Sequence, residues 1–441
     1  MVASGRDVLC SLAPDAAAPL TAWLAWLEAG RGNHIDLGLE RCAEVATRLG
    51  LGQPAPVVVT VAGTNGKGSS VALLASVWHS AGYHVGAYTS PHLLRYNERL
   101  RINGTAVADA VLCTAFARVE AARRAVALTY FEFATLAALS IFAQAKLDVV
   151  ILEVGLGGRL DAVNIVDADV ALIAAIGLDH EEWLGTSREQ IAGEKAGIMR
   201  ADHLAVCSDH EVPHTLIDHA HTLGAPLALL GVDYAFEDDG ASWTWWSGDQ
   251  VLTALPHPAL HGAHQLRNAA GVLKVIDSLQ PRLPVTAAQI AEGLTGVVLL
   301  GRFHRVQREV EYVMDVAHNP QAAAIFTATL SAMAPAPRTH ALIGMLTTKN
   351  HRGFLEPLLA SVQHWHCATL PGINGARAEA LAGCLHQLAP RTDVHCHVSV
   401  AAAHTAIVAG ARPGDRVLVI GSFLTVGAML QILEPSPAAA I

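Results

Sequence analysis

Apolar and polar positions follow helical spacing in some segments and form short apolar runs in others. Leu20, Trp23, Leu24 and Leu27 recur on one helix face, which predicts helical structure within residues 16–50, including a second helix near 37–49. Further helices are expected at 131–145 and 264–279. Apolar runs predict buried strands at 57–61, 85–88, 149–154 and 170–176. This alternation indicates an α/β domain with a largely parallel sheet.

The same alternation starts again near residue 301. Strands are expected at 310–316, 340–345, 364–370, 394–398 and 416–420, with helices at 321–332 and 377–387. We therefore predict two domains, residues 1–299 and 300–441. Between them, the alternating stretch Ser242–Trp246 follows the turn Asp238–Gly240 and predicts a small hairpin region. Its tryptophans are expected to pack on the domain, with stacking on an aromatic ligand as the less favoured alternative.

Composition narrows the class of protein. The 441 residues are 52% hydrophobic and 15% charged and carry a net charge of −10, which excludes a disordered chain and disfavours bulk nucleic-acid binding. No apolar stretch reaches the roughly 18 residues of a membrane helix, because charges such as Lys146 and Asp148 interrupt the longest run. The N-terminus lacks the pattern of a secretory signal. We expect a soluble cytoplasmic protein that contacts neither nucleic acid nor membrane.

Cysteine and lysine usage add two observations. The seven cysteines form no CxxC pair, as expected of free thiols in a reducing compartment. In the segment His395-Cys396-His397 the two histidines would share one face of a strand, but no further ligand is apparent, so a metal site there is disfavoured. Only five lysines accompany 24 arginines, and two of them, Lys67 and Lys195, lie in glycine-containing segments. Arginine cannot replace lysine where a compact charge or a neutral amine is required.

A glycine-rich segment follows the first predicted strand and opens a helix. It reads Gly63-Thr64-Asn65-Gly66-Lys67-Gly68-Ser69. Backbone N–H groups of such a turn and the N-terminus of the next helix bind phosphate, and the lysine neutralises its oxygens. The spacing departs from GxxxxGK[ST], because two residues separate Gly63 from Gly66 and Gly68 follows the lysine. The segment predicts a nucleoside triphosphate site, with a plain glycine turn as the alternative.

A carboxylate is placed to accompany this phosphate site. Glu153 lies at the end of the strand predicted at 149–154 and precedes the sequence Gly155-Leu156-Gly157-Gly158-Arg159. Ligands gather at the carboxyl ends of parallel strands, and a carboxylate there suits Mg²⁺. An ion pair with Arg159 is the alternative.

Six motifs occur in a fixed order. They are Gly63–Ser69, Ser90-Pro91-His92-Leu93, Leu152–Asn164, Asp179-His180, Gly193–Gly197 and Asp315–Pro320. Together they resemble the dihydrofolate synthase/folylpolyglutamate synthase family of the Mur ligase superfamily, and the resemblance covers nearly the whole chain. Two departures concern the second domain: Leu424 stands where bacterial relatives often carry histidine, and His304 follows Gly301-Arg302-Phe303.

The resemblance implies a fold and a reaction. The fold is a P-loop, Mur-ligase-like ATPase domain with a mainly parallel sheet, followed by a smaller Rossmann-like α/β domain. The reaction uses ATP to phosphorylate a substrate carboxylate, and the amine of L-glutamate then attacks the acyl phosphate. Dihydropteroate and reduced folates are the implied acceptors, two Mg²⁺ ions are implied, and a monomer is expected.

The resemblance also assigns residues to roles. ATP would contact Thr64, Asn65, Gly66, Lys67, Gly68, Ser69, Asn268, Arg302 and Asp315. Magnesium would be held by Ser90, Glu153 and His180, the last at a second ion. The pterin would contact Thr129, Tyr130, Phe131, Glu132, Leu160, Asp161 and Ala162, although core packing in the predicted helix is an equal alternative for the first segment. Catalytic roles fall to Lys67, Lys195 and His318, with His318 near the meeting point of ATP and the amine.

Lys195 carries the least intuitive assignment. In the family the matching lysine is carboxylated by CO₂, and the resulting carbamate binds the second Mg²⁺. A neutral amine is needed first, and burial or nearby cations favour it. The residue alone would instead suggest an ion-paired lysine in a helical turn.

Three other functions compete with the bifunctional folate ligase. One is a folylpolyglutamate synthase without dihydropteroate activity, and another is a Mur-type ligase acting on a cell-wall precursor. The third is a nucleotide-gated binding or switch protein. The LTYFEF stretch at Leu128–Phe133 and the overall similarity to bacterial bifunctional enzymes favour both folate activities.

Overall fold

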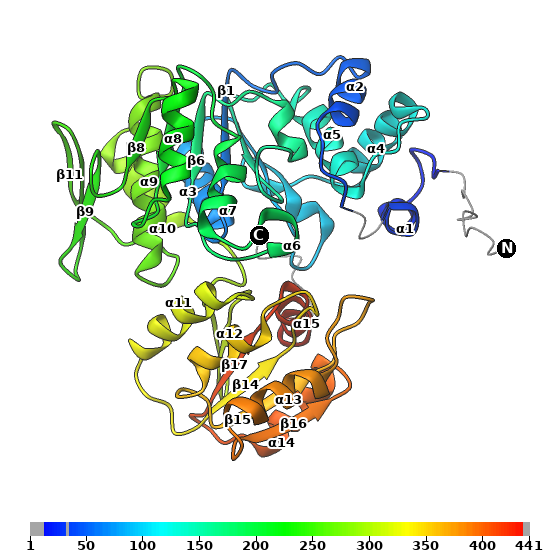
Figure 1. Cartoon of the computed structure of the whole chain (residues 1–441), viewed down its shortest axis with the longest axis vertical. Helices are drawn as coiled ribbons and strands as arrows, with labels where there is room; N and C mark the ends of the chain where they lie inside the picture. The colour runs from blue at the N-terminus through cyan, green and yellow to red at the C-terminus, as the bar shows by residue number, and fades with distance from the viewer. Residues whose placement is uncertain (1–12, 32–34, 435–441) are drawn as a thin grey trace.

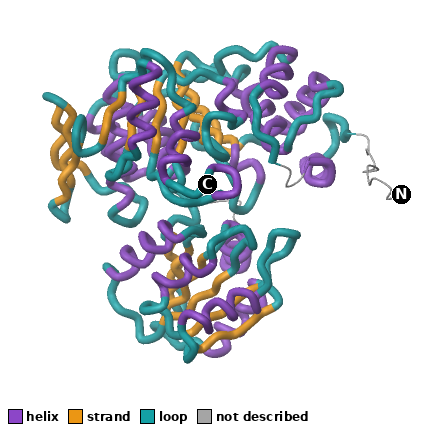
Figure 2. The backbone as a smooth tube through the Cα atoms, in the orientation of Figure 1, coloured by secondary structure: helices purple, strands orange, loops and turns teal. Residues whose placement is uncertain are grey.

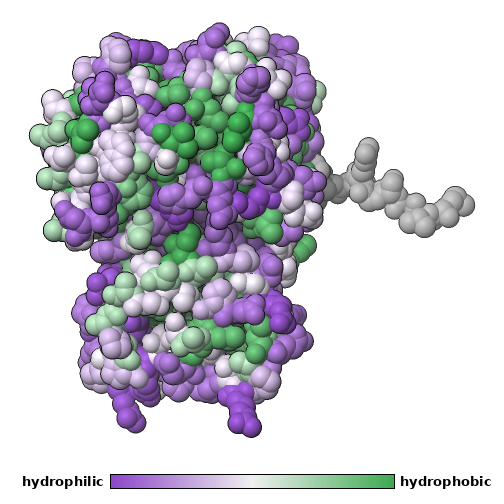
Figure 3. All heavy atoms as spheres, turned by 60° about the vertical axis from the view of Figure 1, so that its left-hand side comes forward, coloured by the Kyte–Doolittle hydropathy of each residue, from purple (hydrophilic) through white to green (hydrophobic). Residues whose placement is uncertain are grey.

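Two β-sheets, each with helices on both faces, organise the chain (Figure 1). The structure is a computed structural model that describes residues 13–31 and 35–434. The sheets are drawn one above the other in Figures 1 and 2, and Figure 3 shows the two lobes meeting across a narrower waist. We call the lobe of the first sheet the N-terminal unit and the lobe of the second sheet the C-terminal unit.

The first sheet has eight strands in the order β4-β3-β2-β5-β1-β6-β7-β8. Their bounds are β1 Val57–Ala62, β2 Val85–Tyr88, β3 Leu100–Ile102, β4 Thr105–Ala106, β5 Val149–Glu153, β6 Val170–Ile173, β7 Leu204–Cys207 and β8 Leu227–Leu229. Neighbouring strands pair in parallel along the part of the sheet β2-β5-β1-β6-β7-β8, whereas β3 and β4 add an antiparallel edge next to β2. The carboxyl ends of the central strands therefore meet at one edge of the sheet, where ligands of open α/β sheets bind.

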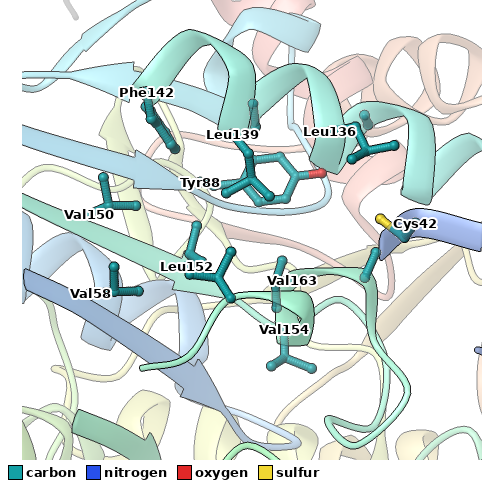
Figure 4. Packing of buried hydrophobic residues seen from close by; sticks show 14 of the residues in the cluster. Cys42, Val58, Tyr88, Leu136, Leu139, Phe142, Val150, Leu152, Val154 and Val163 are labelled. Atoms are coloured by element: carbon teal, nitrogen blue, oxygen red, sulfur yellow. The ribbon is translucent and has the colours of Figure 1, made fainter. Parts of the chain in front are cut away.

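Helices bury both faces of this sheet, which explains why β1 is apolar at every position but Thr60. Helices α1 Leu20–Arg31, α2 Glu40–Arg48, α4 Asp109–Arg123, α5 Tyr130–Phe142, α7 Arg188–Ala196 and α8 His214–Leu223 pack on one face. Helices α3 Lys67–Ser80, α9 His264–Leu279 and α10 Ala287–Gly296 pack on the other. Figure 4 shows the first core, in which Leu139 and Phe142 of α5 face Val150 of β5. Short helices α6 Glu181–Leu184, η1 Tyr96–Arg99 and η2 Ala162–Ile165 lie in the connections.

The predicted hairpin region is a three-stranded antiparallel sheet. Its strands are β9 Ala235–Asp238, β10 Trp243–Ser247 and β11 Gln250–Leu255. The indoles of Trp243 and Trp245 are buried, and their N–H groups donate to the carbonyls of Pro256 (2.9 Å) and Ala270 (3.1 Å). The packing interpretation of these tryptophans is therefore confirmed.

The second sheet has six strands in the order β12-β13-β17-β14-β15-β16, of which only β12 is antiparallel to its neighbour. Their bounds are β12 His304–Gln307, β13 Glu311–Met314, β14 Thr339–Ile343, β15 His364–Ala368, β16 Asp393–His397 and β17 Arg416–Ile420. One face carries α11 Pro320–Ser331, α12 His351–Leu355, η3 Glu356–Leu358 and α13 Ala378–Leu388. The other carries α14 Val400–Gly410 and α15 Phe423–Leu433.

One strand ends earlier than its apolar run predicts. Residues 170–176 were expected to be extended, but β6 stops at Ile173. The carbonyl of Ala175 instead accepts hydrogen bonds from the backbone N–H groups of Thr64 (2.7 Å) and Asn65 (3.3 Å). The apolar residues after Ile173 therefore support the glycine-rich loop, a contact that the local pattern does not reveal.

The structure bears on two expectations from composition, namely those on membrane helices and on cysteines. No helix within residues 13–31 and 35–434 combines the length and the apolar character needed to cross a bilayer. The six cysteines in these ranges are free thiols, four of them buried, and Cys10 lies outside the described residues.

Five histidines gather on one face of the second sheet, around its edge strand β16. They are His340 of β14, His364 and His366 of β15, and His395 and His397 of β16. The rings of His340 and His364 stack at 4.8 Å, those of His366 and His397 stack at 5.3 Å, and Nδ1 of His366 lies 3.1 Å from Nε2 of His397. In the part of the chain that the structure describes, no group of three or more His, Cys, Asp or Glu side chains is arranged to hold a metal ion.

This cluster predicts acid sensitivity. Burial, and then the neighbouring His397, lower the pKa of His366 from 6.5 to about 3. Below pH 6.5 the unfolded chain therefore binds a proton that the folded protein does not, and stability is lost as the pH falls towards 3. Between pH 7 and pH 5 we expect this residue to cost about 1–2 kcal/mol of unfolding free energy.

The pH dependence of thermal unfolding measures the effect. His366→Leu is expected to flatten the decline below pH 6.5, whereas the control His386→Gln, at an exposed position of α13, leaves the profile unchanged. A profile that His366→Leu does not alter would assign the acid sensitivity to other groups.

Candidate active site

The glycine-rich loop lies at the carboxyl end of β1 and opens α3. Gly66 precedes the helix with φ of 89°, and a Cβ atom there would lie 2.6 Å from Oδ1 of Asn268 on α9. Glycine is therefore required both for the left-handed turn and for the close approach of α9. The first N–H groups of α3 have no partner within the helix and point, with the positive end of its dipole, at this loop. The loop has the structure of an anion cradle.

Lys67 is folded back over its own loop. Its Nζ donates to the carbonyls of Gly63 (2.9 Å) and Thr64 (3.2 Å). Burial lowers the pKa of Lys67, and the charge of Glu153 opposes that shift. The ammonium is held at the mouth of the cradle, where phosphate oxygens would meet it.

Glu153, at the end of β5, lies beside this lysine. It is 4% exposed, and its Oε2 accepts a hydrogen bond from the backbone N–H of Ser90 (3.2 Å). Burial raises the pKa of Glu153, and the positive charge of Lys67 opposes the rise. The carboxylate lines the smaller of the cavities described below, so a cation in that cavity can reach it.

Lys195 reaches the same site from α7. The side chain is buried, and it lines the smaller of the two cavities described below. Burial, followed by the charge of Lys67, lowers the pKa of Lys195 to about 7. Gly158 permits this approach, because a Cβ atom there would lie 2.7 Å from the carbonyl oxygen of Glu194. A large fraction of this amine is neutral at physiological pH, which carboxylation requires.

His180 stands at the start of α6, opposite Lys195. Its backbone is left-handed, with φ of 52°, a conformation uncommon outside glycine. Burial, and then the nearby charge of Lys349, lower the pKa of His180 to about 4. The imidazole is therefore neutral and can act as a metal ligand.

The C-terminal unit contributes Arg302 to the site, and Asp315 supports the segment that carries it. A Cβ atom on Gly68 would lie 3.7 Å from Nη2 of Arg302 and 3.8 Å from Oε2 of Glu153, so both side chains reach the start of α3. The Arg302 guanidinium lies 5.7 Å from the ring centre of Phe423. Asp315 accepts hydrogen bonds from the backbone N–H groups of Phe303 and Ala317, each at 2.8 Å, and so orders the segment that carries Arg302.

Hydrogen bonds between side-chain amides tie the phosphate loop to the C-terminal unit. Nδ2 of Asn65 donates to Oε1 of Gln321 (2.6 Å) and to Oδ1 of Asn319 (3.2 Å). His318, just before these residues, has Nδ1 2.9 Å from the carbonyl of Val316 and Nε2 3.2 Å from Oδ2 of Asp179. Both ring nitrogens of His318 thus lie within hydrogen-bond distance of oxygens, which fixes the orientation of the ring.

Two adjoining cavities mark where ligands enter. The smaller, of about 120 Å³, is lined by residues that include Thr64, Asn65, Gly66, Lys67, Gly68, Ser90, Glu153, Asp179, His180, Lys195, Arg302, His318 and Phe423. The larger, of about 810 Å³, lies between the units and is lined by residues that include Asp179, His180, Arg267, Asn319 and Lys349. The structure thus brings Thr64–Gly68, Ser90, Glu153 and His180 together with His318 and Arg302. Three other residues predicted to contact ATP, Ser69, Asn268 and Asp315, line neither cavity.

The residues predicted to contact the pterin are placed differently. Thr129 and Glu132 are buried and cap α5, since Oγ1 of Thr129 accepts from the Glu132 N–H (3.2 Å) and Oε2 of Glu132 accepts from the Thr129 N–H (2.7 Å). Asp161 is also buried; it accepts from the N–H groups of Leu156 and Val163, and burial raises its pKa to about 6. Ala162 is part of the core. Only Tyr130, Phe131 and Leu160 of this set retain partial exposure.

Sequence reasoning missed two side chains at the junction of the units. The motif Asp179-His180 predicts a role for His180 only, and no motif contains Lys349. Nζ of Lys349 donates to Oδ1 of Asp179 at 2.6 Å across the interface. The rarity of lysine in this chain was the available signal, because Lys349 is one of only five.

The donor set fits magnesium. Glu153 offers a carboxylate oxygen, Ser90 a hydroxyl and His180 a neutral imidazole, all on the smaller cavity. Hard oxygen ligands suit Mg²⁺, and a divalent cation would balance the buried Glu153 carboxylate.

A phosphate loop, a buried acid on the adjacent strand and a second α/β unit closing over both define an ATP-dependent ligase of the Mur type. Residues 301–423 match the family model described as Mur ligase, glutamate ligase domain. The chain belongs to the dihydrofolate synthase/folylpolyglutamate synthase family. The enzyme of this name from Escherichia coli (strain K12) is 44% identical over 421 residues, which span 96% of this chain and 97% of the relative.

Solved structures agree with this membership. E. coli FolC in complex with DHPP and ADP superposes with a TM-score of 0.90 at 44% identity, covering 96% of this chain and 100% of that one. A bifunctional folylpolyglutamate synthase/dihydrofolate synthase with Mn, AMPPNP and L-glutamate bound gives a TM-score of 0.87 at 44% identity, with 95% and 99% covered. The predicted fold class is confirmed.

Proposed function

We propose that this protein is an ATP-dependent ligase that joins L-glutamate to dihydropteroate and to reduced folates. The observation that supports it most is the single cavity on which Lys67, Glu153 and Lys195 of one unit meet Arg302 and His318 of the other. Anionic ATP, an anionic carboxylate substrate and an anionic intermediate all need positive charge and exact placement in that space.

The chain's own residues account for both steps of the reaction. A carboxylate oxygen of the substrate attacks the γ-phosphorus of ATP, the bond to ADP breaks, and an acyl phosphate forms. The amine of glutamate then attacks the carbonyl carbon, loses a proton, and phosphate leaves as the amide forms. The α3 N-terminus and Lys67 bind phosphate oxygens, and Arg302 offsets charge from the opposite unit. Asn268 and Asp315 are assigned to the nucleoside part of ATP.

We assign magnesium to Ser90 and Glu153, and a second ion to His180 with a carbamate formed by CO₂ on Lys195. When bound, the ions would neutralise phosphate oxygens and orient them. The burial of Lys195, its place on the smaller cavity and its pKa of about 7 support the carbamate, because CO₂ reacts with the neutral amine.

The remaining assignments follow the family. We place the pterin along Thr129–Glu132 and Leu160–Ala162, with Tyr130 and Phe131 supplying partly exposed aromatic surfaces. We assign residues 1–299 and 300–441 to two domains, with a hinge near residue 300 whose closure excludes water from the acyl phosphate. We expect a cytoplasmic monomer.

A paired assay tests the bifunctional claim. Purified protein with ATP, Mg²⁺ and L-glutamate is offered either dihydropteroate or a reduced folate monoglutamate, and the amide products are measured by mass spectrometry. Both substrates are expected to gain one glutamate. Extension of the monoglutamate alone would reduce the activity to that of a folylpolyglutamate synthase. ATP hydrolysis that ignores both substrates would instead support a nucleotide-gated switch.

A further inference from the structure

One carboxylate of the N-terminal unit collects donors from the C-terminal unit. Oδ1 of Asp179 accepts from Nζ of Lys349 (2.6 Å), and Oδ2 accepts from Nδ2 of Asn319 (3.2 Å). Nε2 of His318 lies 3.2 Å from the same Oδ2. The side chains of Asp179 and Lys349 are 10% and 8% exposed, so the pair is shielded from solvent.

These contacts connect the two units and lie outside the hydrophobic core of either unit. Asp179 lies in the connection between β6 and α6, and Lys349 lies in the connection between β14 and α12. Neither side chain is part of an apolar cluster. The partners of Asp179 across the interface, His318, Asn319 and Lys349, follow it in the chain by 139 to 170 residues. Separation of the units would return both charges to water, where each is well solvated.

The side-chain amide of Asn319 is held in one orientation by its hydrogen bonds. Its Oδ1 accepts from the Ala322 N–H (2.9 Å) and so caps α11, which leaves Nδ2 directed at Asp179 and at Oδ1 of Asn65 (3.1 Å). The start of α11 is thereby tied to the Asp179 loop and to the phosphate loop at once.

We propose that Asp179 is the positioning residue that closes the active site, by contacting Lys349, Asn319 and His318 of the C-terminal unit at once. Through these bonds it holds His318 beside the smaller cavity and Lys349 where the two cavities adjoin. The inference rests on the proposed ligase function, because closure matters for joining an activated carboxylate to an amine. It predicts a loss in the rate of amide formation that exceeds the loss in ATP affinity, since Lys67 and the start of α3 stay in place in the open form while Arg302 is withdrawn.

A double-mutant cycle between Asp179 and Lys349 tests the coupling. Asp179→Asn and Lys349→Met are each expected to lower kcat for amide formation by about 10- to 100-fold, with a rise in KM for ATP that stays well below this loss. The double variant is expected to be no slower than the slower single variant, because both remove the same contact. Lys349→Arg retains the cation and is expected to recover most of the rate.

The chain offers a matched control pair. Lys274 and Asp277 form an ion pair of 2.9 Å within α9, away from the interface. Lys274→Met and Asp277→Asn are expected to change kcat by less than about twofold. Additive losses in the Asp179–Lys349 cycle, or a fully active Asp179→Asn, would overturn the proposal.

A structural readout separates this proposal from the ligase assignment. Small-angle X-ray scattering with Mg²⁺ and a non-hydrolysable ATP analogue is expected to give a larger radius of gyration for Asp179→Asn than for wild type and for Asp277→Asn. If wild type makes no amide, the ligase function is wrong, and scattering still decides the closure. An Asp179→Asn protein as compact as wild type would refute closure by this residue even in an active ligase.

Discussion

Lys195→Arg is expected to lose amide synthesis by about 10²- to 10³-fold. The native side chain is buried, and burial together with the charge of Lys67 brings its pKa to about 7, so a neutral amine is available to CO₂. Arginine keeps a positive charge at every physiological pH and forms no carbamate. The substitution therefore leaves a buried cation where the proposed mechanism needs an anion.

Chemical rescue makes this prediction specific to the carbamate. Lys195→Ala is expected to regain part of its activity when acetate supplies the missing carboxylate. Lys274→Arg serves as the control, since Lys274 forms an ordinary ion pair with Asp277 and should tolerate the change. A fully active Lys195→Arg enzyme would exclude the carbamate and leave the phosphate-loop interpretation intact. The initial rate of amide formation, with and without acetate, is the measurement.

Lys67→Ala is expected to lower kcat/KM for ATP by about 10²- to 10³-fold. The ammonium lies over the carbonyls of Gly63 and Thr64 at the mouth of the anion cradle, so its removal leaves phosphate oxygens without their nearest cation. Acetate is not expected to rescue this variant, because the missing group is positive.

The two lysine variants therefore have opposite signatures. Initial rates measured over a range of ATP concentrations, with and without acetate, distinguish them. Normal ATP use by Lys67→Ala would show that the cradle binds phosphate through its backbone alone. Rescue of Lys67→Ala by acetate would mean that carboxylate acts nonspecifically, and it would remove the support that rescue lends to the Lys195 carbamate.

Local sequence determined the elements whose hydrogen bonds and apolar contacts repeat at a fixed spacing. The helix expected at 264–279 is α9, and the strands expected at 85–88 and 416–420 are β2 and β17. The cradle is likewise contiguous, because β1, the glycine turn and the start of α3 follow one another directly in the chain. Short segments with few apolar residues, such as β4, carry no comparable signal and were not predicted.

The residue types were sufficient to predict the chemistry of the site, but not the environment of each side chain. Glycine turns, a lysine and strand-end carboxylates are readable as residue types. Whether the amine of Lys195 is charged or largely neutral depends on its burial and on the charge of Lys67, which are properties of the folded chain. Thr129 and Glu132 were predicted to contact a ligand, but in the folded chain their side chains form the N-terminal cap of α5.

The sequence by itself determined the two α/β units, the phosphate loop and the family, because each rests on short-range patterns or on ordered motifs. Only the tertiary structure decided that Asp179 meets Lys349, 170 residues away, and that Asn65 meets Asn319. Such pairs form where two units meet whose hydrophobic patterns are independent of each other. The sequence around each residue would allow many other partners. The physical reason is that periodicity reports which face of an element is buried, whereas the pairing of charges depends on how the buried faces place the loops between them.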